Sequence, residues 1–276
     1  MPAERLLLIL IPTYNEAENV EPLFEGIRSL GLQATLLFVN DRSTDGTDEI
    51  LQRIAGQHSW VQVLQRDSKQ GIGSAHLAGI DWAYQRGYRL LLTMDADFTH
   101  SPASIPAFLD KADACDVVIA SRFLEEDSLP GWNLSRRFLT HLGHVMTRLL
   151  LRMPLDATGA FRLYRLDRIP RRLFDLVGSR GYSFFFESLF ILWFNGASII
   201  EIPIVLSARI QGHSKMVVTD AIQSLRFLLR LFRRKIFARA TLRCPLPEKG
   251  QPAAHLVEET RPAVRTASAG GEGTDR

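Results

Sequence analysis

The fold of this chain is decided by the stretch Leu90-Leu-Leu-Thr-Met-Asp-Ala-Asp-Phe-Thr-His100, an apolar run that ends in two carboxylates, Asp95 and Asp97. A continuous apolar run of this length is typical of a strand that is buried on both faces of a parallel sheet. In open α/β sheets, ligands bind beyond the carboxyl ends of the strands, so these acids are expected where a ligand docks. Two hard oxygen donors suit Mg²⁺ or Mn²⁺ together with substrate phosphates. Alternatively, both acids could begin a turn or cap a helix that starts near Ser101 and Pro102.

Other apolar runs of strand length alternate with helical segments along the first part of the chain. These runs cover residues 6–11, 36–39, 61–65 and 117–120. Such an alternation predicts βαβ units, and hence an α/β fold with a mostly parallel sheet flanked by helices. Asn15, with Glu18 three residues later, predicts a capped start for the first helix.

The composition fits a globular α/β protein. The chain has 276 residues, of which 46% are hydrophobic, enough for one large domain with additions or two small ones. Its two cysteines exclude a disulfide framework and indicate a reducing compartment. We expect no signal peptide and no membrane span, because no stretch approaches the ~20 apolar residues that a spanning helix needs. Residues 184–194 come closest, and Glu187 interrupts them.

Two polar loops after early strands have a chemistry that suits a nucleotide. Asp41 follows the second apolar run and can accept from a base N–H or a ribose hydroxyl, although it is equally plausible as a turn acid. Gly71 and Gly73 open a predicted helix, where they permit close approach of the backbone and where the helix N-terminus favours an anion. Each signal is weak when it is considered alone.

Taken in order, these motifs resemble the inverting family-2 glycosyltransferases. The motifs are Pro12-Thr-Tyr-Asn-Glu16, Asn40-Asp41 with Ser43 and Asp45-Gly46-Thr47, Arg66…Lys69-x-Gly-x-Gly73, Asp95-Ala-Asp97 and Ser121-Arg122-Phe123. The resemblance covers roughly residues 5–220 and implies the GT-A fold, a Rossmann-like domain that binds a nucleotide sugar. Later stretches resemble dolichol- or polyprenol-phosphate mannose synthases, namely Trp132…Arg136, Asp156-Ala-Thr-Gly-Ala-Phe161 and Arg209-Ile-Gln-Gly-His-Ser-Lys215.

The resemblance also implies roles for individual residues. The nucleotide sugar would be lined by Pro12, Tyr14, Glu16, Asp41, Lys69 and Asp95. The metal would be held by Asp95, Asp97 and Thr99, where Thr99 stands at a position that is often Gln in the family. The proposed catalytic set is Asp97, Arg122, Arg136, Thr140, Arg209 and Lys215. In this set Arg209 and Lys215 would contact the diphosphate, while Arg122, Arg136 and Thr140 would hold the acceptor phosphate.

Two later segments have the pattern of basic amphipathic helices. Residues 131–153 contain four arginines and no acid, and residues 220–243 contain seven cations and one acid, Asp220. Apolar residues recur in both at helical spacing, which is typical of a membrane-surface segment. The first could also be an ordinary helix packed on the core, and the second could bind a partner helix or nucleic acid. We expect a catalytic domain over 1–219, the second amphipathic helix over 220–243, and a disordered tail over 244–276.

The predicted function is the inverting transfer of a hexose, mannose from GDP-mannose, to a polyprenyl (dolichyl-type) phosphate. We expect a peripheral enzyme on the cytoplasmic face of the membrane, with Mg²⁺ or Mn²⁺ as cofactor and no nucleic-acid partner. No general base is expected, because a phosphate monoester with a second pKa near 6 is already anionic at neutral pH. Three alternatives stay open: another donor such as UDP-glucose, a glycan acceptor, and a membrane-recruited scaffold with an inactive glycosyltransferase fold. The sequence indicates no particular protein partner.

Overall fold

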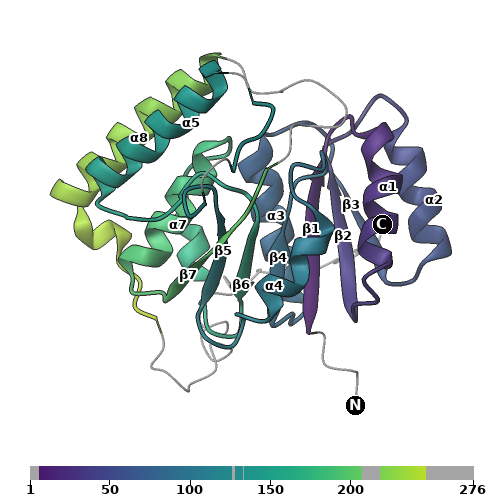
Figure 1. The fold of residues 1–276 in the computed structure, drawn as a ribbon. Coiled ribbons are helices and arrows are strands. Elements are labelled where there is room, and N and C mark those ends of the chain that lie inside the picture. Colours follow the sequence, from purple (N-terminus) through teal and green to yellow (C-terminus); the bar gives the residue numbers. More distant parts are fainter. Residues whose placement is uncertain (1–5, 126–127, 133, 207–217, 247–276) are drawn as a thin grey trace, which may run out of the picture.

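The computed structural model describes residues 6–125, 128–132, 134–206 and 218–246. A seven-stranded sheet in the order β3-β2-β1-β4-β6-β5-β7 forms its centre (Figure 1). The strands are β1 Leu7–Thr13, β2 Ala34–Asn40, β3 Val61–Gln65, β4 Leu90–Thr93, β5 Val117–Ser121, β6 Arg162–Arg165 and β7 Ile199–Pro203. The longer helices are α1 Ala17–Arg28, α2 Thr47–Gln57, α3 Ile72–Gln85, α5 Leu134–Leu151, α7 Ser183–Phe194 and α8 Val218–Phe237. The short helices are α4 Ile105–Leu109 and α6 Arg172–Asp175, with 3-10 turns at Pro102–Ser104 and Arg239–Leu242.

All five predicted strands are present, and those that pair with one another do so in parallel. β1 pairs with β2 and β4, and β2 pairs with β3, each in parallel register. The exception is β6, which runs antiparallel between β4 and β5 and places Arg162 opposite both Thr93 and Ile119. β6 was not predicted, because its two arginines interrupt the apolar pattern that marks a buried strand.

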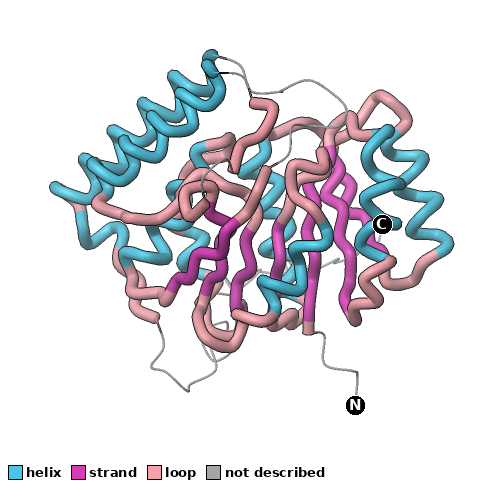
Figure 2. The backbone as a smooth tube through the Cα atoms, viewed as in Figure 1, coloured by secondary structure: helices cyan, strands magenta, loops and turns pink. Residues whose placement is uncertain are grey.

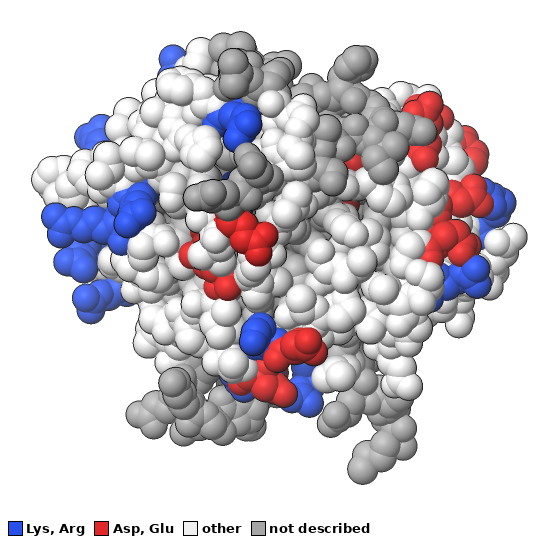
Figure 3. All heavy atoms as spheres, in the orientation of Figure 1, with Lys and Arg blue, Asp and Glu red and all other residues white. Residues whose placement is uncertain are grey.

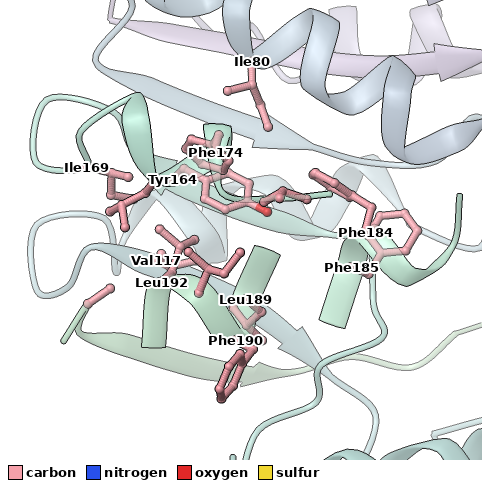
Figure 4. Close-up of a cluster of buried hydrophobic side chains, with 14 of the residues drawn as sticks. Ile80, Val117, Tyr164, Ile169, Phe174, Phe184, Phe185, Leu189, Phe190 and Leu192 are labelled. Carbon is pink, nitrogen blue, oxygen red and sulfur yellow. The ribbon is translucent and has the colours of Figure 1, made fainter. Parts of the chain in front are cut away.

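Helices cover both faces of the sheet (Figure 2). A separate apolar core lies on each side. α1, α2 and α4 pack on one face, and α3, α6 and α7 pack on the other. The most apolar stretch of the sequence forms α7, whose Leu189 and Leu192 lie near Val117 of β5 in one buried cluster (Figure 4). Glu187 interrupts this stretch and is fully buried, where it accepts hydrogen bonds from the backbone and hydroxyl of Ser179.

α5 and α8 lie side by side at the end of the molecule that is opposite to α1 and α2 (Figure 1). Lys235, near the end of α8, donates from Nζ to the carbonyl oxygens of Leu150 and Leu151, the last residues of α5. α8 also buries Leu228 and Leu231 in the core that contains α7. Residues 220–243 therefore pack as part of the same body as the preceding domain.

The ends of the C-terminal segment differ from the predicted boundaries. α8 begins at Val218 and its α-helical part ends at Phe237, before the short 3-10 turn. Cys244 is buried and donates its backbone N–H to Oδ1 of Asn195, so the chain is still packed on α7 at the predicted start of the tail. Residues 247–276 lie outside the described part. Among the described helices, none combines the length and the apolar character needed to cross a membrane.

Candidate active site

A cavity of about 240 Å³ lies at the carboxyl ends of β1, β2 and β4. The structure brings seven of the predicted site residues together in its lining: Pro12, Tyr14, Glu16, Asp41, Lys69, Asp95 and Asp97. Pro12 belongs to the end of β1, and the other six come from four separate loops of the chain, which meet because the strands before them are parallel neighbours.

The loop after β1 is held in place by the loop after β2. Asn15 has a left-handed backbone, with φ of +53°, and its side-chain oxygen accepts from the backbone N–H of Thr44. The N–H groups of Glu16 and Ala17 donate to the side chains of Thr47 and Asp45. The predicted cap of α1 by Asn15 is therefore wrong: the helix begins after Glu16, and Asp45 from the neighbouring loop satisfies its first N–H.

Asp41 and Lys69 stand on the same side of the cavity. The carboxylate of Asp41 forms an ion pair with Arg66 at 2.9 Å. Burial raises the pKa of Asp41, and the positive charge of Arg66 opposes that rise. Lys69 places its Nζ 4.0 Å from the centre of the Tyr14 ring. The ring of Tyr14 therefore helps to hold a cation in the lining of the cavity.

The structure shows why glycine stands at positions 71 and 73, just before α3 and in its first turn, which the sequence did not reveal. Gly71 lines the cavity and has a φ of +93°, a conformation that favours glycine. A Cβ atom on Gly73 would lie 2.5 Å from the Cβ of Phe184 and 2.7 Å from the carbonyl oxygen of Gly181. The close approach at Gly73 is thus made by the start of α7 and the segment that leads into it.

Asp95 and Asp97 line the cavity and do not cap the helix that follows. The side-chain hydroxyl and backbone N–H of Thr99 both donate to Oδ1 of Asp97, at 2.6 and 3.1 Å. The backbone N–H of Asp95 donates to Nδ1 of His100, which is buried. Burial lowers the pKa of His100 to about 4, the negative charge of Asp97 opposes that fall, and Arg122 adds to it. A neutral His100 can accept this hydrogen bond, so it holds the loop in one conformation.

The charge of the lining shows what the cavity can bind. Among the described lining residues, five are carboxylates and one, Lys69, is a cation; the carboxylates are Glu16, Asp41, Asp95, Asp97 and Asp220. An anionic diphosphate would be repelled here unless a cation accompanied it. The donor set of Asp95 and Asp97 fits Mg²⁺ or Mn²⁺, which bind through one or two carboxylates together with phosphate oxygens. Within the described part of the chain, no three acidic, His or Cys side chains are grouped to hold an ion by themselves.

Arg122, which was predicted to hold the acceptor phosphate, is engaged with protein partners. Its Nε and Nη2 bond the two carboxylate oxygens of Asp156, at 2.8 and 2.5 Å, and Nη2 also contacts the hydroxyl of Thr158. Arg122 does not line the cavity. Burial would raise the pKa of Asp156, but the charge and hydrogen bonds of Arg122 bring it below its usual value.

The remaining predicted residues are only partly described. Thr99 contacts Asp97 and does not line the cavity, so its place in the metal set stays a prediction. Thr140 lies half-buried on α5, away from the lining. Arg136 belongs to the first turn of α5, but its side chain is outside the described atoms. Arg209 and Lys215 lie outside the described residues.

The sequence missed the wall of the cavity that α7 and α8 contribute. This wall consists of Gly181, Tyr182, Phe185 and Asp220. Phe185 belongs to a continuous apolar run, which predicts core and gives no sign of a ligand. Asp220 was noticed only as the single acid of a basic helix, and no local pattern connects it with Asp95.

α5 and α8 together present an exposed apolar surface, which we call the helix-pair surface. It is formed by Phe138, Leu139, Leu142, Val145 and Leu149 of α5 with Ile222, Leu225, Leu229, Ile236 and Phe237 of α8. Phe138, Leu149 and Phe237 are 65%, 71% and 81% exposed. Lys and Arg side chains gather on this side of the molecule, whereas acids gather over α1 and α2 (Figure 3). Two of the seven predicted cations have internal roles: Lys235 bonds the end of α5, and Arg234 lies 3.6 Å from the buried Glu187.

Comparison with known proteins agrees with this geometry. Residues 8–170 match the family described as glycosyl transferase family 2. The undecaprenyl-phosphate mannosyltransferase of Micrococcus luteus is 35% identical over 211 residues, which cover 76% of this chain and 87% of that protein. The polyprenol monophosphomannose synthase of Mycolicibacterium smegmatis is 36% identical over 218 residues, covering 78% of this chain and 82% of that protein.

Solved structures with the same architecture are more distant in sequence. Glucosyl-3-phosphoglycerate synthase from Mycobacterium tuberculosis, in complex with Mn²⁺, UDP and glucosyl-3-phosphoglycerate, has a TM-score of 0.59 at 17% identity, covering 84% of this chain and 80% of its own. Mannosyl-3-phosphoglycerate synthase from Rubrobacter xylanophilus has a TM-score of 0.56 at 19% identity, covering 91% and 79%. These likenesses confirm the predicted GT-A fold, with its mostly parallel sheet flanked by helices.

Proposed function

Since the chain belongs to glycosyl transferase family 2, we propose that it transfers mannose from GDP-mannose to a polyprenyl phosphate. The observation that carries this proposal is the convergence of the nucleotide motifs and two strand-end carboxylates in one cavity. The relatives from Micrococcus luteus and Mycolicibacterium smegmatis, whose names describe mannosyl transfer to prenyl phosphates, support the choice of sugar and acceptor.

In this proposal the cavity binds the donor in three parts. Tyr14, Asp41 and Lys69, at the ends of the first three strands, contact the nucleoside. Asp95 and Asp97 would hold Mg²⁺ or Mn²⁺, which neutralises charge on the departing diphosphate. A glucosyltransferase with this fold was crystallised with Mn²⁺ and UDP, which supports a divalent ion. Arg209 and Lys215 remain proposed contacts to the diphosphate oxygens.

The acceptor acts as its own nucleophile. A phosphate monoester is largely dianionic at neutral pH, so its oxygen needs no base to attack the anomeric carbon. The carboxylate of Glu187 on α7 is fully buried and bonded to Ser179, so it is not available as a base. Direct displacement inverts the anomeric centre and gives a β-linked product from an α-linked donor. Arg136 and Thr140, one turn apart on α5, are proposed to orient the acceptor phosphate.

The helix-pair surface is proposed to dock on the cytoplasmic face of the membrane, which would make the protein peripheral. Its exposed apolar side chains are flanked by arginines, the combination that binds anionic lipid at an interface. A nucleic-acid site would use the charges but would gain nothing from exposed Phe138 or Leu149, so no nucleic-acid partner is proposed.

The direct test is a transfer assay with the purified chain, Mn²⁺ or Mg²⁺, a panel of GDP- and UDP-sugars, and polyprenyl phosphate in vesicles. We expect a mannosyl lipid phosphate and free GDP. Asp97→Asn and excess chelator should each reduce turnover by a factor of at least about 10². Asp67→Asn, which removes an exposed acid from a loop near the cavity, is the matched control. Efficient transfer to a polyprenol hydroxyl, or an equal rate with UDP-glucose, would show that the proposed acceptor or donor is wrong.

A further inference from the structure

One wall of the cavity is formed by residues that belong to none of the family motifs. Gly181, Tyr182 and Phe185 come from the start of α7 and the loop before it, and Asp220 comes from the first turn of α8. The hydroxyls of Ser183 on α7 and Ser224 on α8 are 3.5 Å apart, so the two helices are joined close to this wall. The position of Asp220 is therefore fixed by the packing of α8 on α7.

The order of the strands shows which part of a donor meets this wall. The residues proposed for the nucleoside follow β1, β2 and β3, which lie on one side of β4 in the sheet. Of the wall, Gly181 lies close to Gly71, which follows β3. Phe185 faces β6, the neighbour of β4 on its other side, with its ring 5.7 Å from the guanidinium of Arg162. α8, which carries Asp220, lies with α5 beyond the β5–β7 end of the sheet (Figure 1). A nucleotide sugar is a linear molecule that runs from nucleoside through diphosphate to hexose. With the diphosphate at Asp95 and Asp97 of the β4 loop, the hexose lies against the part of this wall that Phe185 and Asp220 form.

We infer that Asp220 binds the transferred hexose by accepting hydrogen bonds from its hydroxyl groups, and that it thereby determines which hexose is accepted. The inference rests on the proposed function, because it requires a nucleotide sugar in the cavity. An ionised carboxylate only accepts hydrogen bonds, and its two oxygens can serve neighbouring hydroxyls together. The side chains of Tyr182 and Phe185 supply the apolar lining that ligand pockets combine with a few polar groups.

Two other roles for Asp220 fit the structure less well. If Asp220 were a third metal ligand, it would be grouped with Asp95 and Asp97 around one position, and the described acids form no such group. If it were a general base, the acceptor would have to be a hydroxyl, whereas a phosphate acceptor needs no base. Recognition of hydroxyl groups uses the negative charge of Asp220 without requiring either role.

The test compares the binding of bare nucleotides and nucleotide sugars to the full chain in the presence of Mn²⁺. Titration calorimetry would give dissociation constants for GDP, GDP-mannose, UDP and UDP-glucose with wild type, Asp220→Asn, Asp220→Ala and the control Gln223→Ala. Gln223 is exposed one turn further along α8 and does not line the cavity. Asp220→Ala should weaken the preferred nucleotide sugar at least tenfold, since it removes hydrogen bonds to a charged group. The affinity for the corresponding bare nucleotide should stay within about twofold or increase, since a negative charge has left the cavity.

A nucleotide sugar with a deoxy hexose provides a second test. A deoxy sugar that lacks the hydroxyl bound by Asp220 should bind wild type poorly, yet wild type and Asp220→Ala should bind it equally well. Parallel weakening of nucleotide and nucleotide sugar, or weaker Mn²⁺ binding, would overturn the inference by showing a structural or metal-binding role. A fall in transfer rate with unchanged donor affinity would overturn it by showing a general base.

The same measurements separate this inference from the proposed function. If wild type prefers UDP-glucose and Asp220→Ala weakens only that sugar nucleotide, the proposed donor is wrong and the inference stands. If wild type binds GDP-mannose and Asp220→Ala leaves it unchanged, the inference fails and the proposed function stands. If wild type binds no nucleotide sugar, both are overturned.

Discussion

Arg122 and Asp156 form a buried ion pair that joins the end of β5 to the loop before β6. Oδ2 of Asp156 accepts from Nε of Arg122 at 2.8 Å and from its backbone N–H at 3.0 Å. The backbone N–H of Asp156 donates in turn to Glu201 of β7. Through its carboxylate and its backbone N–H, Asp156 therefore connects Arg122 at the end of β5 with Glu201 of β7.

We expect Asp156→Asn to lower the free energy of unfolding by about 3–5 kcal/mol, because it leaves the buried guanidinium of Arg122 without its counter-charge. Denaturant unfolding measures the change. The control is Glu125→Gln, an exposed acid three residues further along the same loop as Arg122, which should be within about 0.5 kcal/mol of wild type. A loss of less than 1 kcal/mol would show that the pair contributes little to stability.

The same pair predicts a pH dependence. The pKa of Asp156 is lowered in the folded protein, so its contribution to stability is fully present above the unfolded pKa of about 3.9 and is lost as the pH falls through the folded pKa. The difference in unfolding free energy between wild type and Asp156→Asn should be constant from pH 5 to 7 and should shrink below about pH 4. A difference that does not change with pH would contradict this assignment.

We expect Thr99→Val to weaken the binding of Mn²⁺ in the presence of nucleotide by about 10- to 100-fold, because Asp97 loses the hydroxyl that orients it. Thr99→Ser keeps the hydroxyl and should restore affinity to near wild type. Calorimetric titration with Mn²⁺ in the presence of nucleotide distinguishes the two variants. If both variants bind the metal equally, the hydroxyl of Thr99 does not position Asp97.

Gly73→Ala should destabilise the protein and weaken nucleotide binding, because its Cβ would lie 2.5 Å from Phe184 and force α3 away from the segment that leads into α7. Overpacking of this kind costs about 1–3 kcal/mol. Gly56→Ala is the matched control, since Gly56 is also helical and a Cβ there meets nothing within 4 Å. Gly56→Ala should be neutral or stabilising by up to about 1 kcal/mol. Equal melting temperatures for the two variants would show that the segment before α7 can move.

The double variant Phe138→Ser, Leu142→Ser should reduce binding to vesicles of phosphatidylglycerol and phosphatidylcholine at least tenfold, because both side chains are exposed on α5 and would enter the lipid. Truncation at residue 219 is a poorer test, since it would also remove the buried Leu228 of α8. The control is Leu6→Ser, an exposed apolar residue before β1. Co-sedimentation that is unchanged by the double variant would show that the helix-pair surface does not bind lipid.

The sequence by itself determined five of the seven strands, the α/β class and the position of the two acids that are proposed to bind a metal. These features are local, because a buried parallel strand needs a continuous apolar run and its ligand-binding residues follow it directly in the chain. Asp95 and Asp97 could therefore be placed at a strand end from one stretch of eleven residues. The amphipathic pattern of α5 and α8 was visible for the same reason.

Only the tertiary structure decided which distant residues meet. β6 is a buried strand although it carries Arg162 and Arg165, because neighbouring loops and side chains bond their guanidinium groups. Lys235 is part of a basic stripe in the sequence, yet it bonds the end of α5. Asp220 reaches the cavity only because α8 returns to pack on α7. These contacts join residues that are far apart in the sequence. They depend on how whole helices pack on the sheet and on one another, and a short stretch of sequence does not predict that packing.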